Sequence, residues 1–256
     1  MRLLLFGGTT EGRRLALKLA EAGAEVTVCV ASDYGREQQG QTEGLTVRVG
    51  PLREEEKLAL LQACALCVDA THPYAEHVSA SLRRACEKAG VELLRLKRAE
   101  SELGGARLFP SAAEAAAWLA AREGRILLTT GARELEAFRA LEPERLYPRI
   151  LPSHESLSAC EALGIPHRNI IAMQGPFTRE MNAATLRQYD IRYLVTKDGG
   201  GPGGFAEKRE AAREVGAELL CLQRPQESGL DYDAVYQRCI ARLRAANTNS
   251  DKGEKT

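Results

Sequence analysis

The chain has 256 residues and 44% of them are hydrophobic, so it can bury one large core or two smaller ones. Its 35 Lys and Arg balance 35 Asp and Glu, so no net electrostatic field draws it to nucleic acid or to an anionic membrane. No apolar run is long enough to cross a bilayer, and the N-terminus enters a predicted strand at once, without a signal-peptide pattern. We therefore predict a cytoplasmic protein, a monomer or a small homo-oligomer, with no nucleic-acid or membrane partner.

The first predicted element is a buried strand that leads through a glycine-rich turn into a helix. Residues 3–6 form a continuous apolar run, which is typical of a strand covered on both faces in a parallel sheet. Gly7 and Gly8 permit a tight turn and the close approach of a ligand. Apolar residues at helical spacing begin at Leu15, so the backbone N–H groups before it lie at a helix N-terminus, which favours a phosphate.

This loop departs from the dinucleotide-binding pattern G-x-G-x-x-G at one position. Gly7 and Gly12 match its first and last glycines, whereas Thr9 occupies the place of the second. A hydroxyl there can bond a phosphate, while Glu11 is an unusual neighbour for a pyrophosphate unless it turns away or bonds a ribose. A strand-to-helix turn without a ligand is the alternative. The residues that we assign to cofactor binding in this loop are Gly7, Gly8, Thr9, Thr10, Glu11, Gly12 and Arg13.

The end of the second predicted strand, residues 25–30, selects between NAD and NADP. An acidic residue about 20 positions after the glycines would hold a ribose 2′-hydroxyl, but none lies directly at the end of this strand. Ser32 and Arg36 can instead bind a 2′-phosphate, because a guanidinium contacts phosphate oxygens in a two-pronged way. Asp33 leaves the choice open, and we favour NADPH as the cofactor.

Seven cysteines are scattered along the chain, and we expect them to be reduced thiols because the chain otherwise has the pattern of an intracellular α/β protein. Cys64, Cys67 and Cys86, together with His72 and His77, have the residue types of a zinc site. Cys64 ends a predicted helix and Cys67 lies inside the next strand, where a buried thiol acts as a small apolar side chain. We therefore predict no metal site.

Strands and helices alternate along the chain, which predicts an α/β fold of two Rossmann-like domains, each a parallel sheet flanked by helices, with a cleft between them. The first domain spans 1–98 and carries the glycine-rich loop. A polar connector around Gly104 leads to the second domain, 107–246, and 247–256 is expected to be a disordered tail. The predicted strands are 2–6, 25–30, 45–49, 66–70, 91–96, 126–130, 146–150, 168–172, 191–196 and 217–222. The predicted helices are 11–22, 54–63, 75–89, 111–121, 132–140, 153–162, 178–187, 203–215 and 231–245.

Ligands of open parallel sheets gather beyond the carboxyl ends of the strands, and the strand at 66–70 is followed by a polar turn. Pro73 forces an extended conformation there, so the turn offers Thr71, His72 and Tyr74 to a ligand.

Two further strand ends in the second half carry charged residues. Arg133 follows Thr130 in the first turn of a predicted helix, where its charge opposes the helix dipole, and an anionic ligand would explain its presence. Lys197 and Asp198 stand at the end of the strand at 191–196, before a glycine-rich loop that can move over a ligand. Solvated surface charges on a disordered loop are the alternative for this pair.

Six segments taken together resemble the precorrin-6A reductase family. They are FGGTTEGRRLA, VCVASDYG, DATHPYA, TTGAREL, MQGPF and TKDGGGPGGFAEKREAA, and they follow one another in the family's order from about Arg2 to Pro225. The resemblance implies an NADPH-dependent oxidoreductase of cobalamin biosynthesis. Such an enzyme reduces a ring double bond of precorrin-6A, or of its cobalt form, to give precorrin-6B by transfer of a hydride and a proton.

A tetrapyrrole (precorrin) substrate with many carboxylates also implies local cations in its site. The resemblance leaves the proton donor open: we place Asp198 first, with His72, Tyr74 or an ordered water as alternatives. The residues that we assign to substrate binding are Thr71, Thr130, Arg133, Arg149 and Lys197.

Two other classes of function compete with this one. A reductase of a small sugar or ketone would carry a Tyr-x-x-x-Lys pair after a suitable strand, and the sequence has none there. A non-catalytic nucleotide sensor would need no polar turns at three further strand ends.

Overall fold

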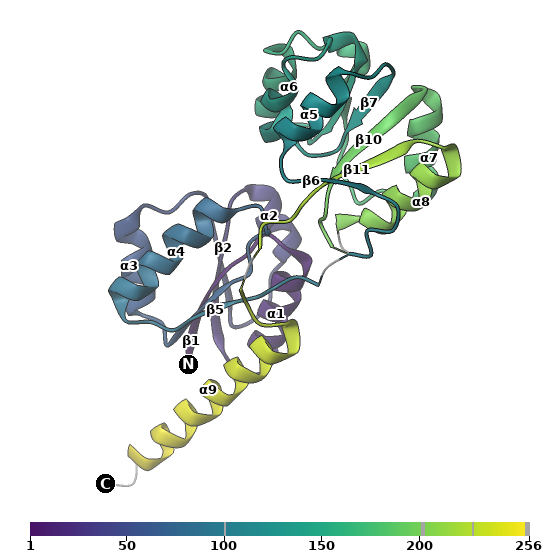
Figure 1. Ribbon diagram of the computed structural model, residues 1–256. Helices are drawn as coiled ribbons and strands as arrows, with labels where there is room; N and C mark the ends of the chain where they lie inside the picture. The colour runs from purple at the N-terminus through teal and green to yellow at the C-terminus, as the bar shows by residue number, and fades with distance from the viewer. Residues whose placement is uncertain (100, 201–202, 227, 254–256) are drawn as a thin grey trace. The chain divides into compact units, whose positions relative to one another are not determined.

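The computed structural model describes residues 1–99, 101–200, 203–226 and 228–253, and the chain divides into two compact units. The first unit comprises Met1–Arg98 and Pro225–Thr256, and the second comprises Ala99–Arg224. Each unit is a parallel sheet flanked by helices (Figure 1), which confirms the predicted α/β fold. In the described ranges, no helix combines the length and the apolar character needed to span a bilayer.

The sheet of the first unit has five parallel strands, and both of its faces are buried. Leu3 and Leu5 pack against α1 (Thr10–Glu21), whereas Leu4 and Phe6 pack against α3 (Glu54–Gln62) and α4 (Glu76–Ala89). Successive side chains of a strand point to opposite faces, so burial on both sides explains the continuous apolar run of residues 3–6. The strands are β1 (Arg2–Phe6), β2 (Glu25–Val30), β3 (Leu45–Val49), β4 (Leu66–Asp69) and β5 (Leu93–Arg95), in the order β3-β2-β1-β4-β5.

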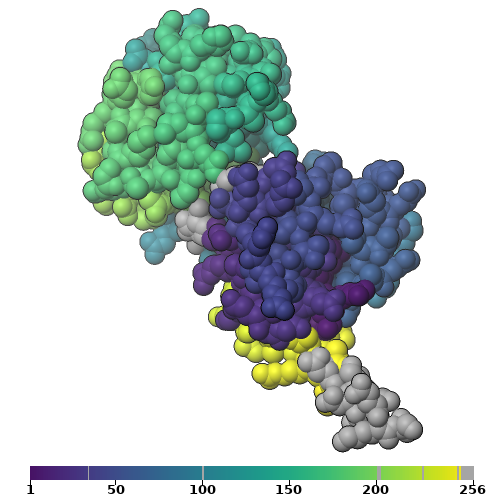
Figure 2. All heavy atoms as spheres, turned by 180° about the vertical axis from the view of Figure 1, so that it is seen from behind, coloured from purple at the N-terminus to yellow at the C-terminus, as the bar shows by residue number. Residues whose placement is uncertain are grey.

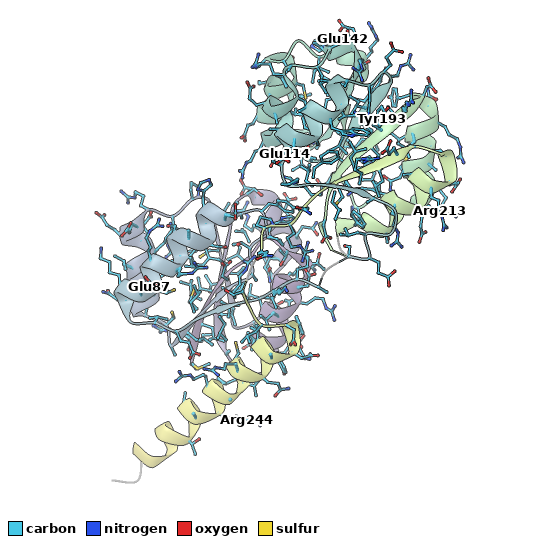
Figure 3. The ribbon with its side chains drawn as sticks, in the orientation of Figure 1. Glu87, Glu114, Glu142, Tyr193, Arg213 and Arg244 are labelled. Carbon is cyan, nitrogen blue, oxygen red and sulfur yellow. The ribbon has the colours of Figure 1, made fainter. Side chains whose placement is uncertain are left out.

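The second unit repeats this architecture with a six-stranded parallel sheet. Its strands are β6 (Arg107–Phe109), β7 (Arg125–Leu128), β8 (Leu146–Ile150), β9 (Ile171–Ala172), β10 (Ile191–Lys197) and β11 (Glu218–Leu222), in the order β6-β11-β10-β7-β8-β9. One face packs against α5 (Ala112–Ala120), η1 (Ala132–Phe138) and α6 (His154–Glu161). The other face packs against α7 (Arg179–Gln188) and α8 (Phe205–Val215). On the first of these faces Tyr193 (Figure 3) lies in the core, with its ring 5.7 Å from the ring of Trp118.

The last helix, α9 (Tyr232–Gly253), belongs to the first unit although it follows the second in sequence (Figures 1 and 2). Val235, Cys239 and Leu243 recur every four residues and join the core cluster that contains Leu3. The predicted second domain, 107–246, therefore includes a helix that packs on the first unit. The expected disordered tail is helical as far as Gly253, and 254–256 lie outside the described residues.

A few predicted elements differ from the structure for local reasons. The predicted helix at 132–140 is a 3₁₀ helix, and the predicted strand at 168–172 shrinks to β9 because η3 (His167–Asn169) occupies its start. One α-helix and one strand were not predicted: α2 (Asp33–Gln39) and β6. The first is short and lacks apolar periodicity, and the second lies at the end of the polar connector. The remaining short 3₁₀ helix is η2 (Pro143–Arg145).

Candidate functional site

The glycine-rich turn between β1 and α1 is tied to the end of the neighbouring strand β4. Thr9 is the N-cap of α1, and its Oγ1 accepts a hydrogen bond from the Gly12 N–H at 3.0 Å. The same hydroxyl donates to the Ala70 carbonyl at 2.9 Å. A hydroxyl has one proton to donate, and Thr9 already donates it to the Ala70 carbonyl. In this arrangement Thr9 positions the turn, and its hydroxyl cannot also donate the hydrogen bond to a phosphate that we predicted.

Two positions of the turn require glycine, each for a different structural reason. Gly8 has φ +130°, a region that disfavours side chains, and a Cβ there would face open space. A Cβ on Gly12 would lie 2.7 Å from the Ala70 Cβ, so Gly12 permits α1 to pack closely on the end of β4. The open side of Gly8 and the first N–H groups of α1, which have no partner within the helix, fit a pyrophosphate.

Glu11, the unexpected acid in this turn, is neutralised by a residue that sequence reasoning missed. Arg98 lies 2.6 Å from the Glu11 carboxylate, and its side chain is buried. The ion pair removes the net negative charge that would oppose an anion beside the turn. The presence of Glu11 could have predicted this pair, because an acid beside an anion-binding turn needs a cation to neutralise it.

Ser32 and Arg36, assigned to the 2′-phosphate, lie together on α2 after the carboxyl end of β2. Ser32 is the N-cap of this helix and accepts a hydrogen bond from the Gly35 N–H at 3.4 Å. Arg36 pairs with Asp33 at 2.8 Å, and both side chains are exposed. An exposed ion pair contributes little, so a 2′-phosphate can displace Asp33. The role of these residues stays a prediction.

The end of β4 carries a buried polar network beneath the DATHPYA turn. Asp69 is 1% exposed, and its Oδ1 accepts hydrogen bonds from the Thr71 N–H, the Thr71 hydroxyl and the Arg95 guanidinium at 3.1, 2.7 and 2.8 Å. Thr71, assigned to the substrate, thus holds the turn in place. Asp69 and Arg95 were not predicted, although a carboxylate inside a buried strand signals a partner.

His72 and Tyr74 are brought together in the same turn. Their rings are 5.5 Å apart, both side chains are half-buried, and the Tyr74 N–H donates to His72 Nδ1 at 3.4 Å. The bond from Thr9 to Ala70 fixes this turn beside the glycine-rich turn. Both candidate proton donors therefore neighbour the predicted cofactor loop within the first unit.

In the second unit the strand order reverses between β7 and β10, which is where open parallel sheets bind ligands. Thr130 follows β7, and its buried hydroxyl has no hydrogen-bond partner among the described residues. Lys197, at the end of β10, donates to Glu134 at 2.8 Å. Arg133 is exposed and forms no ion pair within the described ranges. An orphaned buried hydroxyl at this point fits a polar ligand.

Asp198, our first choice as proton donor, is instead a buried acceptor. Its Oδ1 accepts a hydrogen bond from the Gly200 N–H at 3.1 Å, and its Oδ2 lies 3.2 Å from Arg224 Nη2. A proton donor must carry a proton on one oxygen and direct it at the substrate. One oxygen of Asp198 accepts this hydrogen bond and the other is in an ion pair, so the geometry argues against that role and favours a role in holding the glycine-rich loop.

Arg149 is a buried cation on β8 without an acidic partner among the described residues. It is 7% exposed, its Nη1 donates to Asn182 Oδ1 at 2.8 Å, and its guanidinium lies 4.0 Å from the centre of the Phe177 ring. Burial lowers the pKa of Arg149 to about 10. An anionic ligand is the natural partner of such a group.

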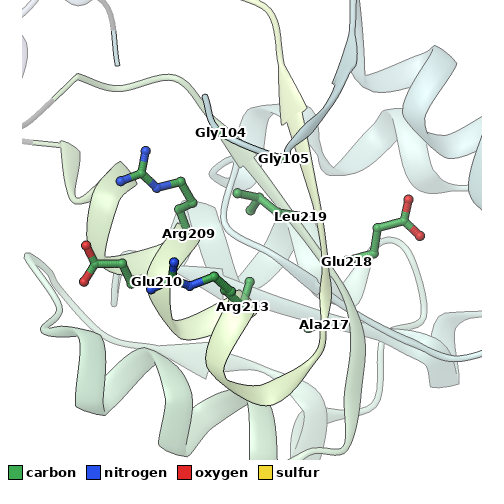
Figure 4. Close-up of a pocket in the computed structure, with 9 residues that line it drawn as sticks. Gly104, Gly105, Arg209, Glu210, Arg213, Ala217, Glu218 and Leu219 are labelled. Atoms are coloured by element: carbon green, nitrogen blue, oxygen red, sulfur yellow. The ribbon is translucent and has the colours of Figure 1, made fainter. Parts of the chain in front are cut away.

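The second unit also contains a hollow of about 410 Å³ (Figure 4). Arg209 and Arg213 of α8 line it together with Glu218, the first residue of β11. It therefore opens at the amino edge of the sheet, opposite the edge that carries Lys197 and Asp198.

The described parts of the chain contain no group of three or more His, Cys, Asp or Glu residues that could hold a metal ion. The seven cysteines are free thiols. Cys67 and Cys86 are both buried in one apolar cluster with Leu61 and Leu82.

The family model described as precorrin-6x reductase CbiJ/CobK matches residues 2–241. The chain belongs to this family. The match covers both units, so the resemblance predicted from the six sequence segments is confirmed, and with it membership of a family of oxidoreductases.

Curated precorrin-6A reductases are similar over nearly their full length. The cobalt-precorrin-6A reductase of Salmonella typhimurium is 36% identical over 95% of this chain and 97% of that protein. The cobalt-precorrin-6A reductase of Priestia megaterium is 34% identical over 91% of this chain and 93% of its own length. The precorrin-6A reductase of Rhodobacter capsulatus is 32% identical over 92% and 93%.

A solved structure titled CobK precorrin-6A reductase has the same fold. It superposes with a TM-score of 0.74 at 28% identity and covers 94% of this chain and 97% of its own. The relatives include both precorrin-6A and cobalt-precorrin-6A reductases.

Proposed function

We propose that this protein reduces one ring double bond of precorrin-6A or cobalt-precorrin-6A with NADPH, giving the corresponding precorrin-6B. The family match over residues 2–241 carries the proposal, and the open glycine-rich turn at a helix N-terminus supports a dinucleotide cofactor. The seven free cysteines suit a reducing compartment, so we place the reaction in the cytoplasm. The cleft expected between the domains and the monomeric or small oligomeric state stay predictions.

The first unit holds the cofactor in this proposal. NADPH supplies the hydride when it is bound. Gly8 leaves room for the pyrophosphate, Thr9 fixes the turn through Ala70, and Ser32 with Arg36 contacts the 2′-phosphate. The remaining cofactor candidates, Thr10, Glu11, Gly12 and Arg13, shape the first turn of α1, where Glu11 is neutralised by Arg98.

The proton needed at the neighbouring carbon comes from the DATHPYA turn, through His72 or Tyr74. Both side chains are half-buried and can carry a transferable proton, and the turn is joined to the cofactor loop. Asp198 is bound by Arg224 and Gly200, so we no longer place it first.

The carboxylates of the macrocycle need cations, and the strand ends of the second unit provide them. Arg149 and Lys197 lie at the carboxyl ends of β8 and β10, with Arg133 exposed in η1. Thr130 offers a buried hydroxyl without a partner among the described residues.

The direct test is turnover by the purified protein. We expect NADPH oxidation that requires precorrin-6A or its cobalt form and that yields the dihydro product by mass spectrometry. A protein that binds NADPH but oxidises it with neither tetrapyrrole would contradict the proposal, and NADPH oxidation with a small ketone in their place would favour the competing reductase class.

A further inference from the structure

Arg149 is held by an amide and an aromatic ring, and not by a carboxylate among the described residues. Asn182 is 1% exposed, and its Nδ2 donates to the carbonyls of Phe177 and Thr178 at 3.3 and 2.8 Å. These bonds fix the amide so that Oδ1 accepts from Arg149. The ring of Phe177 packs closely against Gly175, where the Cβ of any other residue would lie only 3.0 Å from it. The guanidinium is thus positioned before any ligand arrives.

A second cation lies on the same face of the sheet as Arg149, where α8 packs against α7 and Asn182 in the first turn of α7 binds Arg149. Lys208 lies in the first turn of α8, is half-buried, and donates to the Gly203 carbonyl at 3.0 Å. Burial and the charge of Arg149 lower the pKa of Lys208 to about 8. Glu207, its neighbour in sequence, offsets this only in part and makes no ion pair with Lys208 within the described ranges.

A buried cation without a counter-charge destabilises a fold, and a second cation on the same face adds to this cost unless an anion binds there. The charge of Arg98 is paired with Glu11 and that of Arg224 with Asp198, whereas neither Arg149 nor Lys208 forms an ion pair with a carboxylate in the described parts of the chain. This contrast leaves the two cations available to an anionic ligand.

We propose that Arg149 and Lys208 form a subsite for one carboxylate of the tetrapyrrole substrate, with Lys208 as a binding residue beside the glycine-rich loop. The inference rests on the proposed function. A guanidinium and an ammonium together offer a carboxylate several charge-assisted donors. A phosphate of the nucleotide has similar chemistry, and the experiment separates the two.

Binding of an octacarboxylated porphyrin, uroporphyrin, tests the subsite by fluorescence titration, with NADPH affinity measured by calorimetry in parallel. We expect Arg149→Met and Lys208→Met each to weaken porphyrin binding about 10- to 100-fold and to leave NADPH affinity unchanged. Lys208→Met should also raise Tm, because it removes a buried charge. Lys208→Gln keeps a donor for the Gly203 carbonyl and removes the charge, so it measures binding even where Lys208→Met folds poorly.

Arg213→Met is the matched control, because Arg213 is an exposed cation on the same helix (Figure 3). Unchanged porphyrin affinity in the Arg149 and Lys208 variants, or an equal loss in Arg213→Met, would overturn the subsite. A loss of NADPH affinity instead would assign the pair to a nucleotide phosphate. A wild-type protein that binds porphyrin through this pair yet turns over no precorrin would contradict the proposed function and leave the subsite standing.

Discussion

Arg224 and Asp198 form a buried ion pair at the end of β10, with Nη2 3.2 Å from Oδ2 and each side chain 7% exposed. Arg224 also donates to the Ala99 and Asp198 carbonyls at 3.3 Å. The pair thereby joins the last residue of the second unit to its first residue and to the glycine-rich loop. Its energetics distinguish a structural role for Asp198 from a catalytic one.

Replacing Asp198 with Ala should lower the free energy of unfolding by about 3–5 kcal/mol, because it removes the carboxylate that is paired with the buried charge of Arg224. Urea unfolding measures this, and Arg224→Met should cost a similar amount. The double variant should cost less than the sum of the two. If Asp198→Ala instead unfolds like the wild type and slows single-turnover NADPH oxidation about 10²- to 10⁴-fold, Asp198 is the proton donor after all.

Replacing Gly8 with Val should abolish tight NADPH binding, because the side chain fills the open side of the turn and φ +130° disfavours it. Gly23→Val is the matched control, since Gly23 has φ +91° and equally open surroundings but lies at the amino end of β2. Both variants should lose similar stability. Equal NADPH affinity in the two, measured by calorimetry, would place the nucleotide elsewhere.

Arg36→Ala should weaken NADPH binding by about 1.5–3 kcal/mol and leave NADH binding nearly unchanged, because only NADPH carries the 2′-phosphate. Asp33→Asn is the companion variant, since it frees Arg36 from its 2.8 Å ion pair. It should leave NADPH affinity unchanged or raise it. An equal loss for both cofactors in Arg36→Ala would refute the assignment.

Anion binding at the Arg149 and Lys208 subsite should weaken as the pH rises through about 8, the lowered pKa of Lys208. The groups that act on this ammonium are Arg149 of β8, Glu207 of α8 and Cys221 of β11. Cys221 stays a neutral thiol here, because burial raises its pKa to about 12. Uroporphyrin titrations at pH 7 and pH 9.5 should therefore differ for the wild type and agree for Lys208→Met.

The lowered pKa of Lys208 also determines how the stability of the ligand-free protein depends on pH. The ordinary pKa of a lysine is 10.5, so between about 8 and 10.5 the unfolded chain binds more protons than the folded one. The free energy of unfolding should rise with pH in that window, by up to about 1.4 kcal/mol per unit. Below pH 8 the burial cost is fully present. Lys208→Met should remove this rise, and a rise of the same slope in the variant would assign it to another group.

The sequence predicted those parts of the fold that depend on local patterns. The buried run before Gly7 and the start of the helix after the glycine-rich turn are visible because apolar periodicity acts over a few residues. The return of α9 to the first unit was missed, since its apolar face at Val235 and Leu243 fits either sheet equally well in sequence.

The candidate site was predicted less completely for a similar reason. Glycine turns and strand ends mark where a ligand binds, whereas Arg149 was named only because the family resemblance implies cations for a substrate with many carboxylates. The ion-pair partners of Glu11 and Asp198 could not be predicted from the sequence, because Arg98 is 87 positions from Glu11 and Arg224 is 26 positions from Asp198. Tertiary pairing therefore decides which charged residues are structural and which are open to a ligand.

Isotope transfer tests the central claim most directly. Purified protein should convert precorrin-6A or cobalt-precorrin-6A, with NADPH deuterated at the transferred position in ordinary water, to a product that carries one deuterium by mass spectrometry. Unlabelled NADPH in D₂O should give one non-exchangeable deuterium at the neighbouring carbon, delivered by the DATHPYA turn. Both labels together support hydride and proton transfer as proposed. A product without the cofactor's deuterium, or no reduced product from either tetrapyrrole, would contradict the account.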